Sequence, residues 1–309
     1  MMRNCLKPHT ALWFRHLTAA AIAALMLNAC MTVSTECLPQ ITFAVAADVQ
    51  SQETPSHNLS ANDYTVWAAP VKSHLYEIGD NRLERVEYVG DHILLEHYTA
   101  DTQTLLDSRT LELPLPLYGG CFHGSKYNFI VCGLENTEDD PDAEVIRLLK
   151  YSMDWELLDE SSVCDINTHT PFSAGSMRMI EYNGKLVVYT SHTMYARSEE
   201  WDIHHQSNLP LVFDQESMKL EQTFYNFSLI SDTGYVSHSF NQFIQTDGTY
   251  IYRVDHGDAH PRAISITRCS CSGKITDVSY CLTQTIPGYA GDNYTNASIG
   301  GLSCPHPAA

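Results

Sequence analysis

The densest group of reactive side chains in this sequence follows a predicted strand near residue 255. The segment Asp255-His256-Gly257-Asp258-Ala259-His260-Pro261-Arg262 holds two carboxylates, two imidazoles and a guanidinium within eight residues. Asp255, His256 and Asp258 have the short spacing that a loop can wrap around a divalent cation. A carboxylate beside His256 could also orient that imidazole as a general base. The alternative is a solvated turn in which an aspartate caps local amides and Arg262 pairs with a carboxylate.

Catalysis would need further groups that the sequence does not supply. Ser237 and Ser239 are close in sequence, but no G-x-S-x-G elbow surrounds either serine. Two acids this close in sequence cannot be assigned to opposite sides of a sugar ring. Neither GxxxxGK[ST] nor GxGxxG occurs. A binding or scaffolding module is therefore the favoured function, and a secreted hydrolase or lyase using the same histidines and acids is the alternative.

A β-hairpin is expected to position this segment. Apolar residues alternate through Phe240, Phe243 and Ile244, and an Asp247-Gly248 turn leads into the run Tyr250-Ile251-Tyr252-Arg253-Val254. Asp-Gly between two such runs is typical of a tight hairpin turn.

The hairpin belongs to a repeat. Similar hairpins begin near residues 120, 175, 237 and 300, at spacings of 55, 62 and 63 residues. A second series, anchored on Tyr98, Tyr151, Phe213 and Cys269, has spacings of 53, 62 and 56 residues. Four strands per unit, joined by turns, predict an all-β fold made of β-propeller blades, about four of them. A β-sandwich is the alternative, although it does not explain why the two series have similar spacings along the chain.

A fifth unit begins near Asn296 and stops within a few residues, since Pro305 and Pro307 oppose a strand. We expect either closure at four blades or a truncated copy of a longer propeller, and we favour truncation. An unclosed propeller would leave a sheet edge and apolar faces exposed.

In a propeller, the loops that leave the second strand of each blade form a rim around one axis. Equivalent exits here are Gly133–Asn136, Ser191–Tyr195 and Asp255–Asp258. We therefore predict one ligand-binding pocket at that rim. Its candidate residues are His192, His205, His238, Asn241, Asp255, His256, Asp258 and Arg262.

Three segments carry a resemblance to a known group: YVSHSFNQF, DHGDAHPR and GDNYTNASIGGL. They resemble segments of secreted β-propeller-like repeat proteins of Gram-positive bacteria, loosely of the WD40/YVTN type. The similarity covers about residues 75–302. It implies the fold and an extracellular setting, and it brings no catalytic residues with it. Chains of that group run on past the Gly-Gly pair, which adds to the expectation of truncation.

The charge balance limits the partners. With 37 acidic and 18 basic residues, the chain has a formal charge of −19. Nucleic-acid affinity comes mostly from basic side chains, so nucleic acid is not expected as a partner. We expect an extracellular glycan, a peptide or a small ligand.

The N-terminus predicts export. Positive residues precede the apolar stretch Leu17–Leu27, whose 11 residues are too few for a membrane-spanning helix. Cleavage before Cys30 would leave a lipidated cysteine and a membrane anchor, whereas cleavage after Ala46 would free the protein. The predicted organisation is an export region at 1–47, a linker and first strand at 48–74, the propeller at 75–302 and a tail at 303–309. The protein is expected to be secreted or anchored at the cell surface.

Seven cysteines follow the export region, at positions 121, 132, 164, 269, 271, 281 and 304. A hairpin turning near residues 125–127 would place Cys121 opposite Cys132, so these two are the predicted disulfide. Cys269 and Cys271 share one strand face and are poorly placed to pair with each other. No second CxC or CxxC completes a tetrahedral metal site with them.

Overall fold

The computed structural model describes residues 69–195, 205–223, 237–260, 262–271, 275–285 and 299–304. Of these, the side chains of residues 237, 258–260, 270–271 and 275–285 are not described. The chain divides into two units, Met1–Thr54 and Pro55–Ala309, and every described residue belongs to the second. The predicted export region, the lipidation site Cys30 and most of the predicted linker lie outside the described residues.

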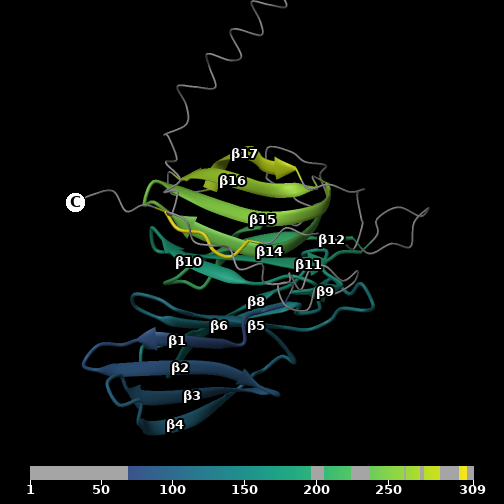
Figure 1. Ribbon diagram of the computed structural model, residues 1–309. Coiled ribbons are helices and arrows are strands. Elements are labelled where there is room, and N and C mark those ends of the chain that lie inside the picture. The colour runs from purple at the N-terminus through teal and green to yellow at the C-terminus, as the bar shows by residue number, and fades with distance from the viewer. Residues whose placement is uncertain are drawn as a thin grey trace, which may run out of the picture. The chain divides into compact units, whose positions relative to one another are not determined.

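The first sheet is a four-stranded antiparallel meander (Figure 1). Its strands are β1 (Ser73–Glu77), β2 (Arg82–Val89), β3 (His92–Thr99) and β4 (Leu105–Glu112). The β1–β2 turn contains Asp80 and Asn81 at φ of 50° and 60°. Aspartate and asparagine tolerate this left-handed conformation better than most residues, which favours a tight turn here.

The second sheet repeats the same order of neighbours. It consists of β5 (Leu117–His123), β6 (Asn128–Gly133), β7 (Ile146–Tyr151) and β8 (Leu157–Val163). Every residue of β6 is buried, whereas most residues of the outer strand β8 are exposed. The sequence of an inner strand that is covered on both faces is a continuous run of apolar residues, whereas the sequence of an edge strand is not.

The third and fourth units form one nine-stranded sheet through a single pairing, Ser207 with Ser237. The third unit contains β9 (Thr170–Pro171), β10 (Arg178–Tyr182), β11 (Lys185–Thr193), β12 (Gln206–Asp214) and β13 (Leu220–Thr223). The fourth contains β14 (Ser237–Thr246), β15 (Tyr250–His260), β16 (Ala263–Cys271) and β17 (Ile275–Thr285).

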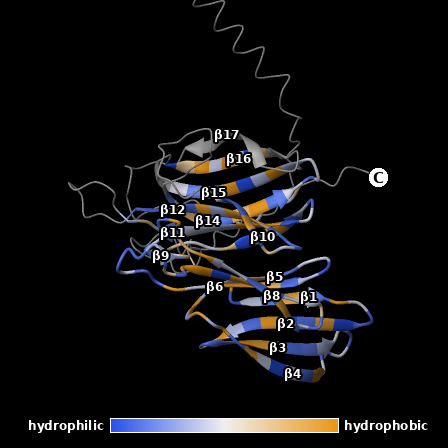
Figure 2. Cartoon of the chain, turned by 180° about the vertical axis from the view of Figure 1, so that it is seen from behind, coloured by the Kyte–Doolittle hydropathy of each residue, from blue (hydrophilic) through white to orange (hydrophobic). Residues whose placement is uncertain are grey.

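Three apolar cores join consecutive units in chain order. One holds Ile93 and Leu149 of the first two units, and the next holds Phe129 and Leu209 of the second and third. The last holds Tyr189 and Ile251 of the third and fourth. Figure 2 shows hydrophobic and hydrophilic residues alternating along the strands, which supplies an apolar face for such packing. The predicted all-β fold of the β-propeller type, with four blade-like units, is confirmed.

The segment expected to open a fifth unit is described only at residues 299–304, where no strand is assigned. Asn241 Nδ2 of β14 donates to the carbonyl of Ile299 over 2.8 Å. This contact ties the described end of the chain to the fourth unit. No helix in the described residues is both long enough and apolar enough to cross a membrane.

The predicted disulfide between Cys121 and Cys132 is not formed. Both thiols are free and buried. In the β5–β6 pair, Cys121 lies opposite Ile130 and Cys132 lies opposite Tyr118. His123 pairs with Asn128, so the hairpin is centred one residue earlier in the chain than a pairing of Cys121 with Cys132 requires. Burial raises the pKa of Cys121 to about 12 and that of Cys132 to about 11, so both are held as neutral thiols at pH 7.

Candidate functional site

The segment near residue 255 is a strand and not the predicted loop. The turn at Asp247-Gly248 is confirmed, with Gly248 at φ 86°, but β15 then continues from Tyr250 to His260. Successive side chains on a strand point to opposite faces, so Asp255 and His256 do not share one cation. The side chain of Asp258 is outside the described part. No group of three or more His, Cys, Asp or Glu in the described residues is arranged to hold a metal ion.

Asp255 lies between the third and fourth units, with 1% of its surface exposed. Its Oδ1 accepts a hydrogen bond of 2.7 Å from Ser265 Oγ. Its Oδ2 accepts from the hydroxyl of Tyr189 and, over 3.3 Å, from Asn208 Nδ2. Burial raises the pKa of Asp255 to about 7, although the bond from Ser265 acts in the opposite direction. The carboxyl is therefore enclosed by protein, where a substrate in solution cannot reach it.

His256 and Arg262 are also buried, with 0% and 8% of their surfaces exposed. The His256 ring meets the Phe240 ring edge to face, with centroids 6.4 Å apart. In register, Phe240 lies opposite His256 on the neighbouring strand. The contact between His256 and Phe240 is therefore packing between neighbouring strands.

His192 lies against the other face of the third unit. On β11, His192 points to the opposite face from Tyr189, which contacts Asp255. It shares its face with Val188, which belongs to the core between the second and third units. Its Nδ1 is 2.7 Å from Thr168 Oγ1, and no partner for Nε2 occurs in the described residues. Complete burial lowers the pKa of His192 to about 3, so the ring is neutral. His192 and Asp255 thus belong to different interfaces between units.

His205 and His238 do come together. Both are half-buried, and their ring centroids are 6.5 Å apart. Burial lowers the pKa of His205, and the charge of His238 adds to this effect. Asn241 lies further along β14 and bonds to the Ile299 carbonyl.

A polar cluster that the sequence did not indicate lies between the first and second units. Glu84 of β2 is 1% exposed, and its Oε2 accepts from Trp155 Nε1 over 2.8 Å. His97 Nε2 is 3.1 Å from the same oxygen, while His97 Nδ1 is 2.7 Å from Asp107 Oδ1. His123 Nδ1 is 3.5 Å from Glu84 Oε1.

Burial opposes ionisation of Glu84, but the nearby imidazole of His123 and the hydrogen bonds from Trp155 and His97 together lower its pKa. Glu84 lies two residues before Val86 and therefore shares its buried face, which could have marked Glu84 as a polar residue on that face. Its partners lie up to 71 residues away, so no spacing in the sequence shows them.

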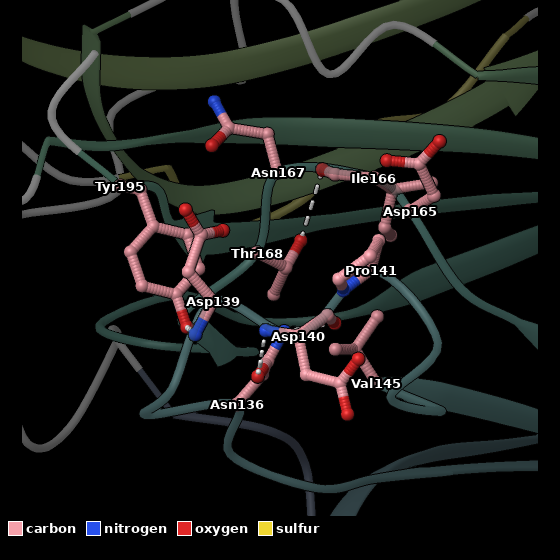
Figure 3. A pocket seen from close by; sticks show the side chains of 10 residues that line it. All are labelled: Asn136, Asp139, Asp140, Pro141, Val145, Asp165, Ile166, Asn167, Thr168 and Tyr195. Carbon is pink, nitrogen blue, oxygen red and sulfur yellow. Dashed lines mark hydrogen bonds between the residues drawn. The ribbon is translucent and has the colours of Figure 1, made fainter.

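A small polar pocket is formed by three loop segments of the second and third units (Figure 3). It is lined by Asn136, Asp139, Asp140, Pro141, Val145, Asp165, Ile166, Asn167, Thr168 and Tyr195. Asn136 and Tyr195 lie in two of the three strand exits that were expected to form the rim. The structure therefore brings two equivalent exits together, but the other residues at this pocket are not the predicted histidines.

Hydrogen bonds fix these segments to one another. Asn136 N donates to the carbonyl of His169 over 2.8 Å, and Asp139 N donates to the hydroxyl of Tyr195 over 3.0 Å. Thr168 connects the pocket to the buried His192 through its hydroxyl. The cavity of about 40 Å³ has room for a few waters or the tip of one side chain, at about 10–15 Å³ for each water.

No protein-family model matches this chain, and no curated protein matches it. Several solved structures have local similarity. A mutant of the Synechocystis apocarotenoid oxygenase gives a TM-score of 0.39 at 11% identity over 66% of this chain and 46% of that one. An α-L-arabinofuranosidase from Clostridium thermocellum gives 0.37 at 14% identity over 70% and 76% of the two chains. The Dos1 propeller gives 0.41 at 11% identity over 69% and 47%.

This chain spans less than half the length of the oxygenase and of the Dos1 structure. At TM-scores below 0.5, none of these similarities extends to a shared activity.

Proposed function

We propose that the chain is an extracytoplasmic binding module of the β-propeller type, whose ligand contacts the loop rim that includes Asn136, Tyr195, His205 and His238. The ligand is an extracellular glycan, a peptide or a small molecule. Export follows from the N-terminal sequence, either with a lipid anchor at Cys30 or as a free protein.

One observation carries this proposal. The acids and imidazoles that would do chemistry are enclosed: Asp255, His256 and His192 are 1%, 0% and 0% exposed. Enzymes place such groups where a substrate can meet them, in a concave site. The polar groups that line the rim pocket are on loops, where binding residues are commonly found. A hydrolase or lyase using Asp255 and His256 would first have to open the interface between units.

Glycan and peptide arrays probed with the purified mature protein test the proposal. We expect saturable binding without change to the ligand. Binding should fall when rim side chains are substituted, for example in His205→Ala with His238→Ala. It should be unaffected by Glu112→Gln, which changes an exposed carboxylate on the outer strand of the first unit. Release of a product that is abolished in Asp255→Asn, with the variant still folded, would establish the enzyme instead.

The extracytoplasmic setting has its own test. The full chain with a C-terminal tag, expressed in a bacterial host, should be recovered outside the cytoplasm. Mass spectrometry of the mature N-terminus distinguishes acylated Cys30 from a terminus after Ala46. Recovery of the uncleaved chain in the cytoplasm would refute the export part of the proposal.

A further inference from the structure

The rim pocket is lined by carboxylates that have no cationic partner among the described residues. Asp139, Asp140 and Asp165 line it from two loops, and none of the three forms an ion pair in the described residues. By contrast, Glu144 at the end of the same loop pairs with Arg147, at Oε1–Nε 2.7 Å. Negative charge is therefore concentrated at the pocket, and no ion pair among the described residues neutralises it.

Two neighbouring groups are affected by this charge. The pKa of Cys164 is raised by burial, and then by the charges of Glu144, Asp142, Asp140 and Asp165. Burial likewise raises the pKa of Tyr195, with a contribution from the charge of Asp139. Anionic forms are thus disfavoured on both sides of the pocket, and a cation is favoured for the same electrostatic reason.

An uncharged side chain also lacks a partner there. Asn167 lines the pocket with 9% of its surface exposed, and its Oδ1 is buried without any hydrogen-bond donor in the described residues. Leaving a buried acceptor without a donor is destabilising. A ligand that brings N–H donors would remove this cost, whereas an anion or an apolar group would not.

The arrangement suits an organic cation better than a metal ion. Divalent metals need several oxygens at about 2.0–2.6 Å from one point, and the described acids are not gathered in that way. An ammonium group donates to acceptors that are spread more widely. Figure 3 shows Asp139 beside the Tyr195 ring on one side of the pocket and Asp165 on the other. An aromatic ring beside carboxylates attracts alkylammonium groups through its negatively charged face.

The geometry points to a primary ammonium group as the ligand of this pocket, presented by a lysine side chain of a partner peptide. This rests on the proposed binding function and specifies the chemistry of the rim. The small cavity takes the tip of one such side chain, and the surrounding acidic loop meets the rest of a basic segment. Attraction of this kind weakens as ionic strength rises.

The test compares two peptide mimics that differ only in the terminal ammonium group, which the second one lacks: Nα-acetyl-lysine N-methylamide and Nα-acetyl-norleucine N-methylamide. Binding is followed by the alkylation rate of Cys164 with iodoacetamide, measured on the Cys164 peptide by mass spectrometry. Bound ammonium lowers the pKa of this exposed thiol. The alkylation rate at fixed pH should therefore rise with the concentration of the lysine compound and level off when the pocket is saturated. The norleucine compound should have no effect.

Asp139→Asn and Asp165→Asn should each weaken the apparent affinity of the lysine compound about threefold, and the double variant about tenfold. Asp154→Asn, an exposed turn residue away from the pocket, is the matched control and should bind as the parent does. Asp140 is avoided because its carboxylate accepts the amide of Asp142 over 2.9 Å.

Equal responses to the two compounds, or full affinity in the double variant, would overturn the assignment. Array binding to neutral or acidic ligands through the same rim would also overturn it, while leaving the proposed binding function intact. Absence of any saturable ligand, together with turnover of an array compound, would reject the binding function itself.

Discussion

Two carboxylates in this protein are equally hidden from solvent and ionise differently. Glu84, between the first and second units, and Asp255, between the third and fourth, are each 1% exposed. Glu84 has an indole N–H and two imidazoles around it, and its pKa is lowered in spite of burial. Asp255 has hydroxyl and amide donors, and its pKa is raised to about 7. The donors around each acid, together with how deeply the protein encloses it, decide its charge.

The two sites should therefore give opposite dependences of stability on pH. A raised folded pKa means that the folded state binds the proton of Asp255 more tightly than the unfolded state. The stabilisation is complete below the ordinary value of 3.8 and is lost as pH rises through about 7. The lowered pKa of Glu84 acts in the other direction, since its stabilisation is present above its ordinary value and is lost as pH falls.

The largest effect is expected at Asp255. A shift from 3.8 to about 7 corresponds to a loss of about 4 kcal/mol in the free energy of unfolding between those pH values. Asp255→Asn, neutral and of equal size, should remove this loss and be more stable than the parent at pH 8. Urea unfolding at pH 5, 6, 7 and 8 measures it. Parallel profiles for parent and variant would contradict the raised pKa.

The next effect is expected at Glu84. Glu84→Gln removes the charge that accepts from His97 and Trp155, and should lower the free energy of unfolding at pH 7 by about 3 kcal/mol. The variant should also lose the acid-side decline of the parent. Glu112→Gln on β4 is exposed and serves as control. If Glu84→Gln behaves like that control, the donor explanation fails.

A smaller effect tests one donor at a time. Trp155→Phe removes the 2.8 Å bond to Glu84 Oε2 and should cost about 1–2 kcal/mol. In the Glu84→Gln background the same change should cost less, because the charge that strengthens the bond is gone. Unfolding curves of the two single variants and the double variant give the coupling. Strict additivity would show that the indole acts through packing alone.

The smallest effect is expected at the rim. Asp165 is exposed and in no ion pair among the described residues, so Asp165→Asn should change the free energy of unfolding by no more than about 0.5 kcal/mol. Such a result would separate a carboxylate available for ligand from the two that stabilise the fold. A loss of several times that size would assign Asp165 to the fold as well.

Much of the architecture could be predicted from the sequence. The spacing of the hairpins indicated the units, and the turn at Asp247-Gly248 is where expected. The end of the following strand was misplaced: polar residues from Asp255 onward suggested a loop, yet β15 continues because β16 pairs with it through Gly257. A sheet covered on both faces hides polar residues as well as apolar ones, so polarity did not report exposure there.

The candidate site was harder to predict. Asn136 and Tyr195 belong to two of the aligned strand exits and line one pocket, but neither was among the predicted site residues. His192 and Asp255 were expected to converge, but they face different neighbours. Alternation along a strand gives two faces without saying which neighbour each face meets, and a hairpin centred one residue earlier than expected was enough to separate Cys121 from Cys132.

The sequence by itself determined the strands, the turns and the number of units, since these depend on the period of apolar residues and on local turn chemistry. Only the tertiary structure decided which polar groups are enclosed, which donors surround Glu84 and Asp255, and which acids remain at the rim. Those properties arise from contacts between residues distant in the chain, where the donors and the dielectric environment are set by packing.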